Sequence, residues 1–311
     1  MDMKGRVLLL GGNGMVGRNI LSNEHCNRWE FLSPKSKDLN LVDFESTLNF
    51  ITKAKPDFII NAAGIVGGIK ANINNPVNFL VKNIDIGRNL VIAARQAGVK
   101  KLINLGASCM YPRNISNPLK EDMLLSGELE PTNEGYALAK IMTARLCQYI
   151  NSEDSQFHYK TIIPCNIYGC FDKFDPERSH LVPAIIKKLH QAIVNKDELV
   201  EIWGDGLARR EFMYADDFAD AIFYSLDNFD QMPQLINIGV GKDHSINEYY
   251  EIVARVLGYK GSFIHNHDKP VGMQKKLVSI KKQTSWGWKP KTELKEGIQK
   301  TYHYFLKEFE Q

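Results

Sequence analysis

The 311-residue sequence has few cysteines and no run of apolar residues long enough to cross a membrane. Its five cysteines are odd in number and form no Cys-x-x-Cys pair, which argues against a disulfide framework or a zinc site. No apolar stretch approaches the roughly 20 residues that a membrane-spanning helix needs. The first predicted strand begins so early that no room is left for a signal peptide. We therefore expect a cytoplasmic protein with neither a metal site nor a membrane partner.

The sequence also lacks a strong excess of charge of one sign. Its formal net charge is +3 at pH 7 and its basic residues are dispersed, so nothing indicates a nucleic-acid partner. Two lysine pairs near the C-terminus, Lys275–Lys276 and Lys281–Lys282, are the exception, and we interpret them as a solvated face in preference to a phosphate contact. The length suits one large dinucleotide-binding domain with a smaller second domain.

A glycine-rich segment, residues 11–17, directly follows the short apolar strand predicted over Arg6–Leu10. Glycines at this place let the backbone turn tightly and approach a pyrophosphate, and the helix that follows offers free N–H groups to it. Such glycine spacing is common by chance, but its position between a strand and a helix favours a dinucleotide site. We expect cofactor contacts from Gly11, Gly14, Met15, Val16 and Gly17.

The loop after the second predicted strand, near Trp29–Leu32, lacks the acid that an NAD site usually uses to bind the ribose 2′-hydroxyl. It carries Lys35 and Lys37 instead, which suit a 2′-phosphate. We therefore favour NADPH over NADH, the alternative being that the lysines only solvate the loop. A third strand, near Asp57–Asn61, opens into Ala62 and Ala63, where the backbone can pass close to a cofactor.

A tyrosine and a lysine four residues apart, Tyr136 and Lys140, lie on one face of a predicted helix. Tyr136 is the only one of twelve tyrosines with lysine at this spacing. A nearby cation favours the phenolate, so the pair can exchange a proton near neutral pH. Ser108 follows another apolar strand and can hydrogen-bond the same carbonyl oxygen. The pattern indicates carbonyl reduction, although the spacing alone is more often an ordinary surface contact.

Strands and helices alternate over the first 165 residues, which predicts a doubly wound α/β fold with a parallel sheet covered on both faces. The active site then belongs at the carboxyl ends of the strands. Beyond residue 169 the pattern loosens into a polar loop (172–179), helices (180–194, 213–226 and 245–257) and strands (201–210 and 235–239). We expect residues 1–165, with segments returning near 213–239, to bind the cofactor, and residues 166–212 and 240–311 to bind the substrate.

Taken together, the motifs resemble the extended short-chain dehydrogenase/reductases and, within that superfamily, the GDP-L-fucose synthase family. The similarity covers nearly the whole chain. It is carried by residues 14–17, 66–69, 71–72, 108–112, 129–134, 166–169, 179–180, 203–204 and 210–212. The resemblance implies a Rossmann-type fold with a smaller C-terminal substrate domain, NADPH as the cofactor and a homodimer.

The resemblance also implies roles for individual residues. Tyr136 would be the general acid, Lys140 its partner and the anchor of the nicotinamide ribose, and Ser108 the second donor to a C4 carbonyl. Cys109 and His180 would epimerise carbons next to the ketone, which needs a base and an acid. Further implied contacts are Asn166 with both cofactor and substrate, Arg210 with the diphosphate, and Gly68, Asn133, Leu181 and Trp203 with the GDP-sugar.

Three departures from the family pattern leave the sugar open. Gly135 stands where proline usually precedes the tyrosine, Gly12-Asn13 replaces His-Arg, and residues 269–274 differ from Lys-Pro-Asp-Gly-Thr-Pro. We expect a GDP-linked 4-keto deoxyhexose or heptose, and an enzyme that either epimerises and reduces or only reduces after a separate epimerase. A sugar-nucleotide 4-epimerase or dehydratase is disfavoured, because the loop after the second strand and the segment 108–110 lack the acids these enzymes use. A non-catalytic NADP-binding sensor is disfavoured because Tyr136 and Lys140 are both present.

Overall fold

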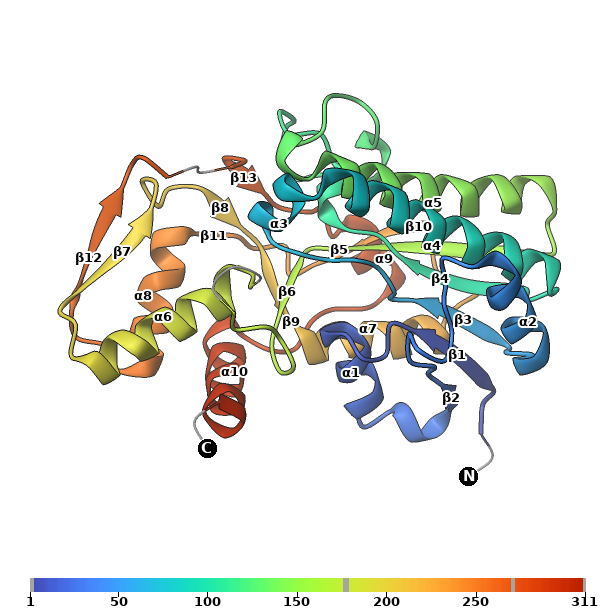
Figure 1. The fold of residues 1–311 in the computed structure, drawn as a ribbon, viewed down its shortest axis with the longest axis horizontal. Coiled ribbons are helices and arrows are strands. Elements are labelled where there is room, and N and C mark those ends of the chain that lie inside the picture. The colour runs from blue at the N-terminus through green and yellow to red at the C-terminus, as the bar shows by residue number, and fades with distance from the viewer. Residues whose placement is uncertain (1–2, 176–178, 270–271, 310–311) are drawn as a thin grey trace.

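The computed structural model describes residues 3–175, 179–269 and 272–309. Its centre is a six-stranded sheet with the order β10-β5-β4-β3-β1-β2, in which every pairing is parallel (Figure 1). The strands are β1 (Arg6–Leu10), β2 (Glu30–Leu32), β3 (Phe58–Asn61), β4 (Lys101–Leu105), β5 (His158–Pro164) and β10 (Leu235–Ile238). The winding direction reverses between β1 and β3, and ligands of such sheets bind outside the carboxyl ends of the strands at this reversal.

Helices cover both faces of the sheet, as the alternation of elements predicts. Helices α2 (Phe44–Ala54), α4 (Pro76–Gln96) and α5 (Glu134–Glu153) lie on one face, and α1 (Met15–Ser22) and α7 (Ala215–Asp227) on the other (Figure 1). Strand β1 shows why helices pack on both faces, because successive side chains of a strand point to opposite faces and both sets are apolar here. Its Leu8 and Leu10 join the first group of helices, and its Val7 and Leu9 join the second.

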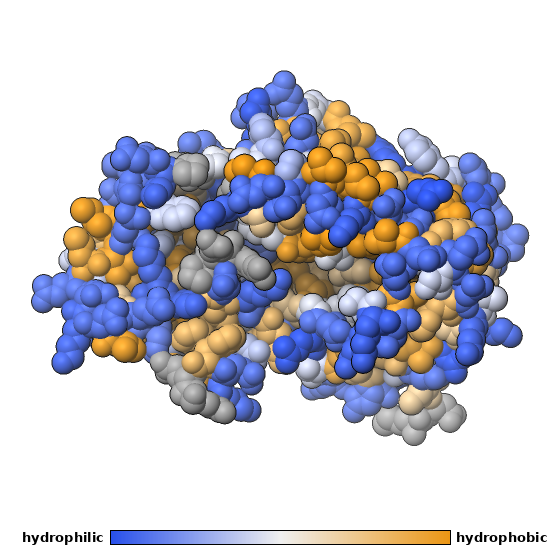
Figure 2. All heavy atoms as spheres, viewed as in Figure 1, coloured by the Kyte–Doolittle hydropathy of each residue, from blue (hydrophilic) through white to orange (hydrophobic). Residues whose placement is uncertain are grey.

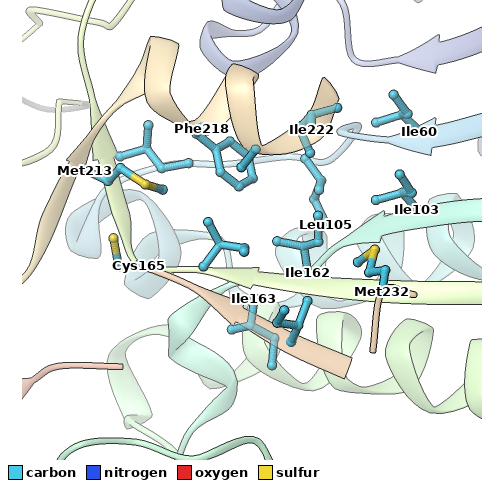
Figure 3. Packing of buried hydrophobic residues seen from close by; sticks show 14 of the residues in the cluster. Ile60, Ile103, Leu105, Ile162, Ile163, Cys165, Met213, Phe218, Ile222 and Met232 are labelled. Carbon is cyan, nitrogen blue, oxygen red and sulfur yellow. The ribbon is translucent and has the colours of Figure 1, made fainter. Parts of the chain in front are cut away.

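Two segments from the second half of the chain lie against this sheet. Strand β10 pairs with β5, and α7 packs beside α1. In Figure 3, Phe218 and Ile222 of α7 point toward Leu105 and Ile162 of the sheet. The helix expected from residue 213 begins two residues later, because Phe212–Tyr214 form strand β9 and pair with β6 (Asn166–Tyr168).

A second region with its own hydrophobic core lies beyond β6 and β9. Helices α6 (Leu181–Asn195), α8 (Ile246–Leu257) and α10 (Leu294–Phe309) pack there against the parallel pair β7 (Leu199–Trp203) and β12 (Ser262–Asn266). Ser245 is the N-cap of α8, since its hydroxyl accepts the Glu248 N–H at 3.1 Å. A small sheet places β8 (Arg209–Arg210) between β11 (His244–Ser245) and β13 (Lys275–Lys276).

The remaining elements are short. They are the helices α3 (Ile69–Asn74) and α9 (Lys281–Trp286), and 3-10 turns at Cys26–Arg28, Ser108–Met110, Glu121–Met123 and Pro131–Asn133. The polar loop predicted over 172–179 is found at residues 172–175 and 179, which lie in no helix or strand, but Asp172 and Phe174 are buried. Residues 176–178 of that prediction lie outside the described residues. Within the described ranges, no helix is both long and apolar enough to span a bilayer, and no group of three His, Cys, Asp or Glu side chains is arranged to hold a metal ion.

Candidate active site

The glycine turn after β1 lies at the reversal point of the sheet. Gly11 has φ +86°, and a Cβ atom there would lie 2.5 Å from the Ala62 carbonyl oxygen. A Cβ atom on Gly17 would lie 2.3 Å from the Gly11 oxygen, so both positions need glycine. Helix α1 starts after Gly14 without a side-chain cap, which leaves its first N–H groups available to a phosphate. The turn therefore fits a pyrophosphate.

The adjoining backbone extends this cradle. Ala62 and Ala63 follow β3, and a Cβ atom on Gly11 would lie 2.5 Å from the Ala62 oxygen and 2.8 Å from the Ala63 nitrogen. A Cβ atom on Gly12 would meet the Ser33 hydroxyl at 1.8 Å, so the loop after β2 also lies against the turn. Lys35 and Lys37 follow in that loop with exposed side chains. This is the place where a 2′-phosphate would need cations.

Ser108, Tyr136 and Lys140 meet at the carboxyl end of β4. Ser108 begins the short turn that follows β4, and this turn packs against α5, which carries the other two residues. The Lys140 ammonium donates a hydrogen bond to the Leu105 carbonyl oxygen at 2.9 Å and lies 5.8 Å from the centre of the Tyr136 ring. Ser108 and Lys140 are buried, whereas Tyr136 is half-buried and keeps an accessible surface.

Burial, and not the nearby cation, dominates the pKa of Tyr136. Loss of hydration raises the pKa of the phenol, and the neighbouring Cys109 acts in the same direction. Burial also lowers the pKa of Lys140 to about 8. The expected effect of Lys140 on the phenol is thus outweighed by burial. At neutral pH the phenol holds its proton and can donate it.

Cys109 and His180 approach this group from different elements. Cys109 follows Ser108; burial raises the pKa of its thiol, and Lys276 and Lys140 act against that rise. His180 is the residue before α6 and keeps an exposed surface. Partial loss of hydration, with Lys173 and Lys276, lowers the pKa of the imidazole. At neutral pH the thiol is therefore protonated and the imidazole is uncharged.

Lys276 is a candidate site residue that the sequence analysis assigned to a solvated face. It lies opposite Arg210 in the β13–β8 pair, and both side chains are half-buried. Burial lowers the pKa of Lys276, which also interacts electrostatically with Cys109, Arg210 and Glu130. The interpretation of the lysine pair as a solvated face is wrong for Lys276. The side chain of Lys275 is exposed and forms an ion pair at 3.1 Å with the buried carboxylate of Asp243. Strands of two residues carry no periodic signal that would have predicted this pairing.

The other expected contacts are spread more widely. The Asn166 amide donates to the carbonyl oxygen of Glu211, the residue after Arg210, at 2.9 Å. Asn133, before α5, has a buried Oδ1 with no partner in the described part of the chain. Gly68 and Leu181 are half-buried at the starts of α3 and α6. Trp203 is 54% exposed at the end of β7, with Lys269 5.5 Å from its ring.

The surface is hollowed between the two regions of the molecule, with apolar residues visible at its depth, as Figure 2 shows. The sheet, the glycine turn and the Ser108–Tyr136–Lys140 group define a dinucleotide-dependent oxidoreductase of the short-chain dehydrogenase/reductase type. The sequence profile of the NAD dependent epimerase/dehydratase family matches residues 7–239, and the chain belongs to this family.

Individual relatives are similar over nearly their whole length. A GDP-L-colitose synthase of Yersinia pseudotuberculosis is 55% identical over 303 residues, which are 97% of this chain and 98% of that protein. A GDP-L-fucose synthase of Azorhizobium caulinodans is 48% identical over 97% of each chain. A solved structure of a GDP-mannoheptose C4 reductase from Campylobacter jejuni with NADP bound is 30% identical, with a TM-score of 0.87 over 98% of this chain and 99% of that chain.

Proposed function

We propose that the protein uses NADPH to reduce the C4 ketone of a GDP-linked 4-keto deoxyhexose, after epimerising at least one carbon beside the ketone. The observation that carries this proposal is the convergence of Ser108, Tyr136 and Lys140 at the carboxyl end of β4. Cys109 adjoins this group, and His180 and Cys109 share Lys276 as an electrostatic neighbour. Relatives named for GDP-L-colitose and GDP-L-fucose support the class of substrate.

The cofactor contacts follow the glycine turn. Gly11, Gly14, Met15, Val16 and Gly17 would hold the pyrophosphate, and Lys35 and Lys37 the 2′-phosphate. Lys140 would bind the nicotinamide ribose, next to Ala62, Ala63 and Asn166. When bound, NADPH supplies the hydride for C4. Residues 1–165 with the segments near 213–239 would form the cofactor domain, and the rest of the chain the substrate domain.

The proton chemistry follows from the protonation states of the side chains. Tyr136 holds a proton that it can deliver to the C4 oxygen as the alcohol forms, while Ser108 donates a hydrogen bond to the same oxygen. The same two donors would stabilise the enolate that forms when a proton leaves the carbon beside the ketone. Cys109 holds a proton and the neutral His180 can accept one, so the pair contains the donor and the acceptor that inversion needs.

Substrate binding would use the second region together with two residues of the first, Gly68 and Asn133. Arg210 and Lys276 are adjacent cations of the kind that hold a diphosphate. Burial lowers the pKa of both side chains, and a bound diphosphate would favour their charged forms. Gly68, Asn133, Asn166 and Leu181 would contact the sugar, with the unpartnered Asn133 oxygen as an acceptor for a hydroxyl. Trp203, at the outer end of β7, would contact the nucleotide.

We propose a 3,6-dideoxy sugar, as found in colitose, ahead of the 6-deoxy sugar of fucose, because identity to the colitose relative is 55% against 48%. The test is incubation with GDP-4-keto-3,6-dideoxymannose and with GDP-4-keto-6-deoxymannose in D2O, each with and without NADPH. Expected are deuterium at C5 and NADPH consumption, faster with the dideoxy sugar. NADPH consumption without deuterium would show a reductase without epimerase activity, and no turnover of either sugar would contradict the proposal and direct the search to heptoses.

A Cys109→Ser variant separates the two chemical steps. It should lose deuterium exchange while it still reduces a ketone that already has the product configuration, because Ser108, Tyr136 and Lys140 remain. Equal loss of both activities would assign Cys109 to binding instead of proton transfer.

We further propose a homodimer that forms through α4 and α5, and a cytoplasmic location, because NADPH is supplied there. Val77, Val81 and Leu138 are 71%, 47% and 41% exposed, and Figure 2 shows apolar residues gathered over the start of these helices. Light scattering of the protein after gel filtration should give twice the chain mass, and Val77→Asp with Leu138→Asp should give the monomer.

A further inference from the structure

The segment 169–175 connects β6 to the part of the chain that carries His180, and it lies between α1 and α10. It begins at Gly169, which packs against Ala215, and ends before α6. Phe174 is 3% exposed within the core of the second region, so the segment is not a loose surface loop. Its two sides therefore contact two different parts of the molecule.

On one side, the segment is bound to the helix that follows the glycine turn. The Arg18 guanidinium lies 3.9 Å from the centre of the Phe171 ring, which is a cation–π contact at close range. The buried Asn19 amide donates to the Cys170 carbonyl oxygen at 2.9 Å and to the Met15 carbonyl oxygen at 2.8 Å. One side chain thus ties the first turn of α1 to the segment.

On the other side, aromatic rings of α10 hold the segment in place. Phe171 meets Tyr304 edge to face with ring centres 5.3 Å apart. Phe174 lies 4.8 Å from Phe305 and 5.3 Å from Phe309. Aromatic contacts at these separations add to the hydrophobic effect of burial. A shift of α1 relative to α10 would therefore change the contacts of Phe171, which touches both helices.

The backbone of Phe171 is held in an unfavourable conformation. Its φ angle is +66°, in the left-handed region that bulky side chains rarely adopt. A backbone of this kind persists only where the surroundings impose it. Arg18, Asn19 and Tyr304 provide those surroundings. The conformation of the segment thus depends on the position of α1.

We propose that Arg18, Asn19, Cys170 and Phe171, which we call the latch, couple the cofactor site to the substrate site. The proposal rests on the proposed function for the identity of the two ligands. A pyrophosphate at the N-terminus of α1 fixes the helix, and the latch transmits that position to the segment that leads to His180. Residues of the latch are positioning residues, because none of them contacts the reacting atoms.

The coupling acts equally in both directions, since linkage between two binding sites is reciprocal. NADPH should tighten the binding of the guanine nucleotide, and the nucleotide should tighten the binding of NADPH by the same factor. Couplings of this kind are commonly on the order of tenfold. Reduction should then proceed with a low KM for the sugar nucleotide only while the latch is intact.

Calorimetric titration with GDP, in the absence and presence of saturating NADPH, tests the proposal. In the unaltered protein, GDP should bind about tenfold more tightly when NADPH is present. Arg18→Ala and Phe171→Leu should reduce this factor to less than about twofold while NADPH alone binds as before. Phe171→Tyr keeps the ring over Arg18 and should keep the factor, which distinguishes the contact from the stability of the fold.

Lys100→Ala provides the matched control. It removes another cation–π contact, 4.4 Å from Lys100 to the Phe157 ring, which lies at the amino ends of the central strands. The control should retain the coupling. Unchanged coupling in Arg18→Ala, or no coupling in the unaltered protein, would overturn the latch. If coupling is present but neither ketone is reduced, the proposed function fails and the latch stands.

Discussion

The two walls of the candidate site are built in different ways. The wall of Ser108, Tyr136 and Lys140 stands on a five-residue strand and a 20-residue helix that share a buried core. The wall of His180, Arg210 and Lys276 stands on two-residue strands and the start of α6, and its side chains keep more accessible surface. The first wall suits chemistry that needs fixed geometry. The second wall suits the binding of a negatively charged ligand.

Replacing Tyr136 by phenylalanine should have the largest effect, because it removes the proton donor from the rigid wall. We expect reduction to slow by roughly 10²-fold to 10⁴-fold, with NADPH binding little changed. Stopped-flow measurement of NADPH oxidation, with a separate fluorescence titration of NADPH, would show this. Tyr149→Phe on the same helix, where the side chain is 62% exposed, is the control and should react like the unaltered protein. Reduction at the unaltered rate in Tyr136→Phe would refute the assignment.

Replacing Lys276 by alanine should weaken the second wall without disabling the first. Loss of one charge-assisted hydrogen bond to a diphosphate costs about 1.5–3 kcal/mol, so KM for the sugar nucleotide should rise roughly tenfold to 150-fold. The value of kcat for reduction should change much less. Lys275→Ala removes the neighbouring lysine, which pairs with Asp243, and should leave KM nearly unchanged. A large fall in kcat with constant KM would place Lys276 in the chemistry instead.

The pKa of Lys140 makes the rigid wall sensitive to pH. Its ammonium is charged below its pKa of about 8 and neutral above it, because burial lowers that pKa. The value of kcat/KM for NADPH, which reports the free enzyme, should therefore fall about tenfold per pH unit above pH 8. In Lys140→Arg the decline should vanish, because a guanidinium stays charged, although kcat/KM would be lower throughout. An identical decline in both proteins would assign it to another group.

The smallest effect is expected at the edge of the cofactor site. Lys35 and Lys37 are exposed, so their ion pairs with a 2′-phosphate are screened by solvent and salt. Replacing both by alanine should weaken NADPH binding several-fold and leave NADH binding unchanged. Fluorescence titrations with both cofactors at low salt would measure the difference. If the binding of NADPH and of NADH were weakened equally, the lysines would not be part of a 2′-phosphate site.

The elements that carry the rigid wall and the glycine turn are also the ones whose positions could be predicted from the sequence. Gly11–Gly17 and the spacing of Tyr136 and Lys140 are local patterns, and a strand followed by a helix fixes where such residues point. Lys276 and strand β9 depend on pairing between distant short segments, which have no periodicity of their own. The effect of burial on the pKa of Tyr136 could not be predicted, for a related reason. Spacing shows which charge is near, but hydration depends on everything packed around the phenol.

The place of β10 in the central sheet has a consequence for synthesis of the chain. Strand β5 is complete at residue 164, but its outer edge is covered only when residues 235–238 have been made. Until then β5 presents unpaired backbone groups, which can pair with another chain. We expect a fragment that ends near residue 165 to aggregate when it is expressed alone, even though it contains the glycine turn and the Ser108–Tyr136–Lys140 group. Attempts to isolate the cofactor half should therefore retain residues up to at least 239.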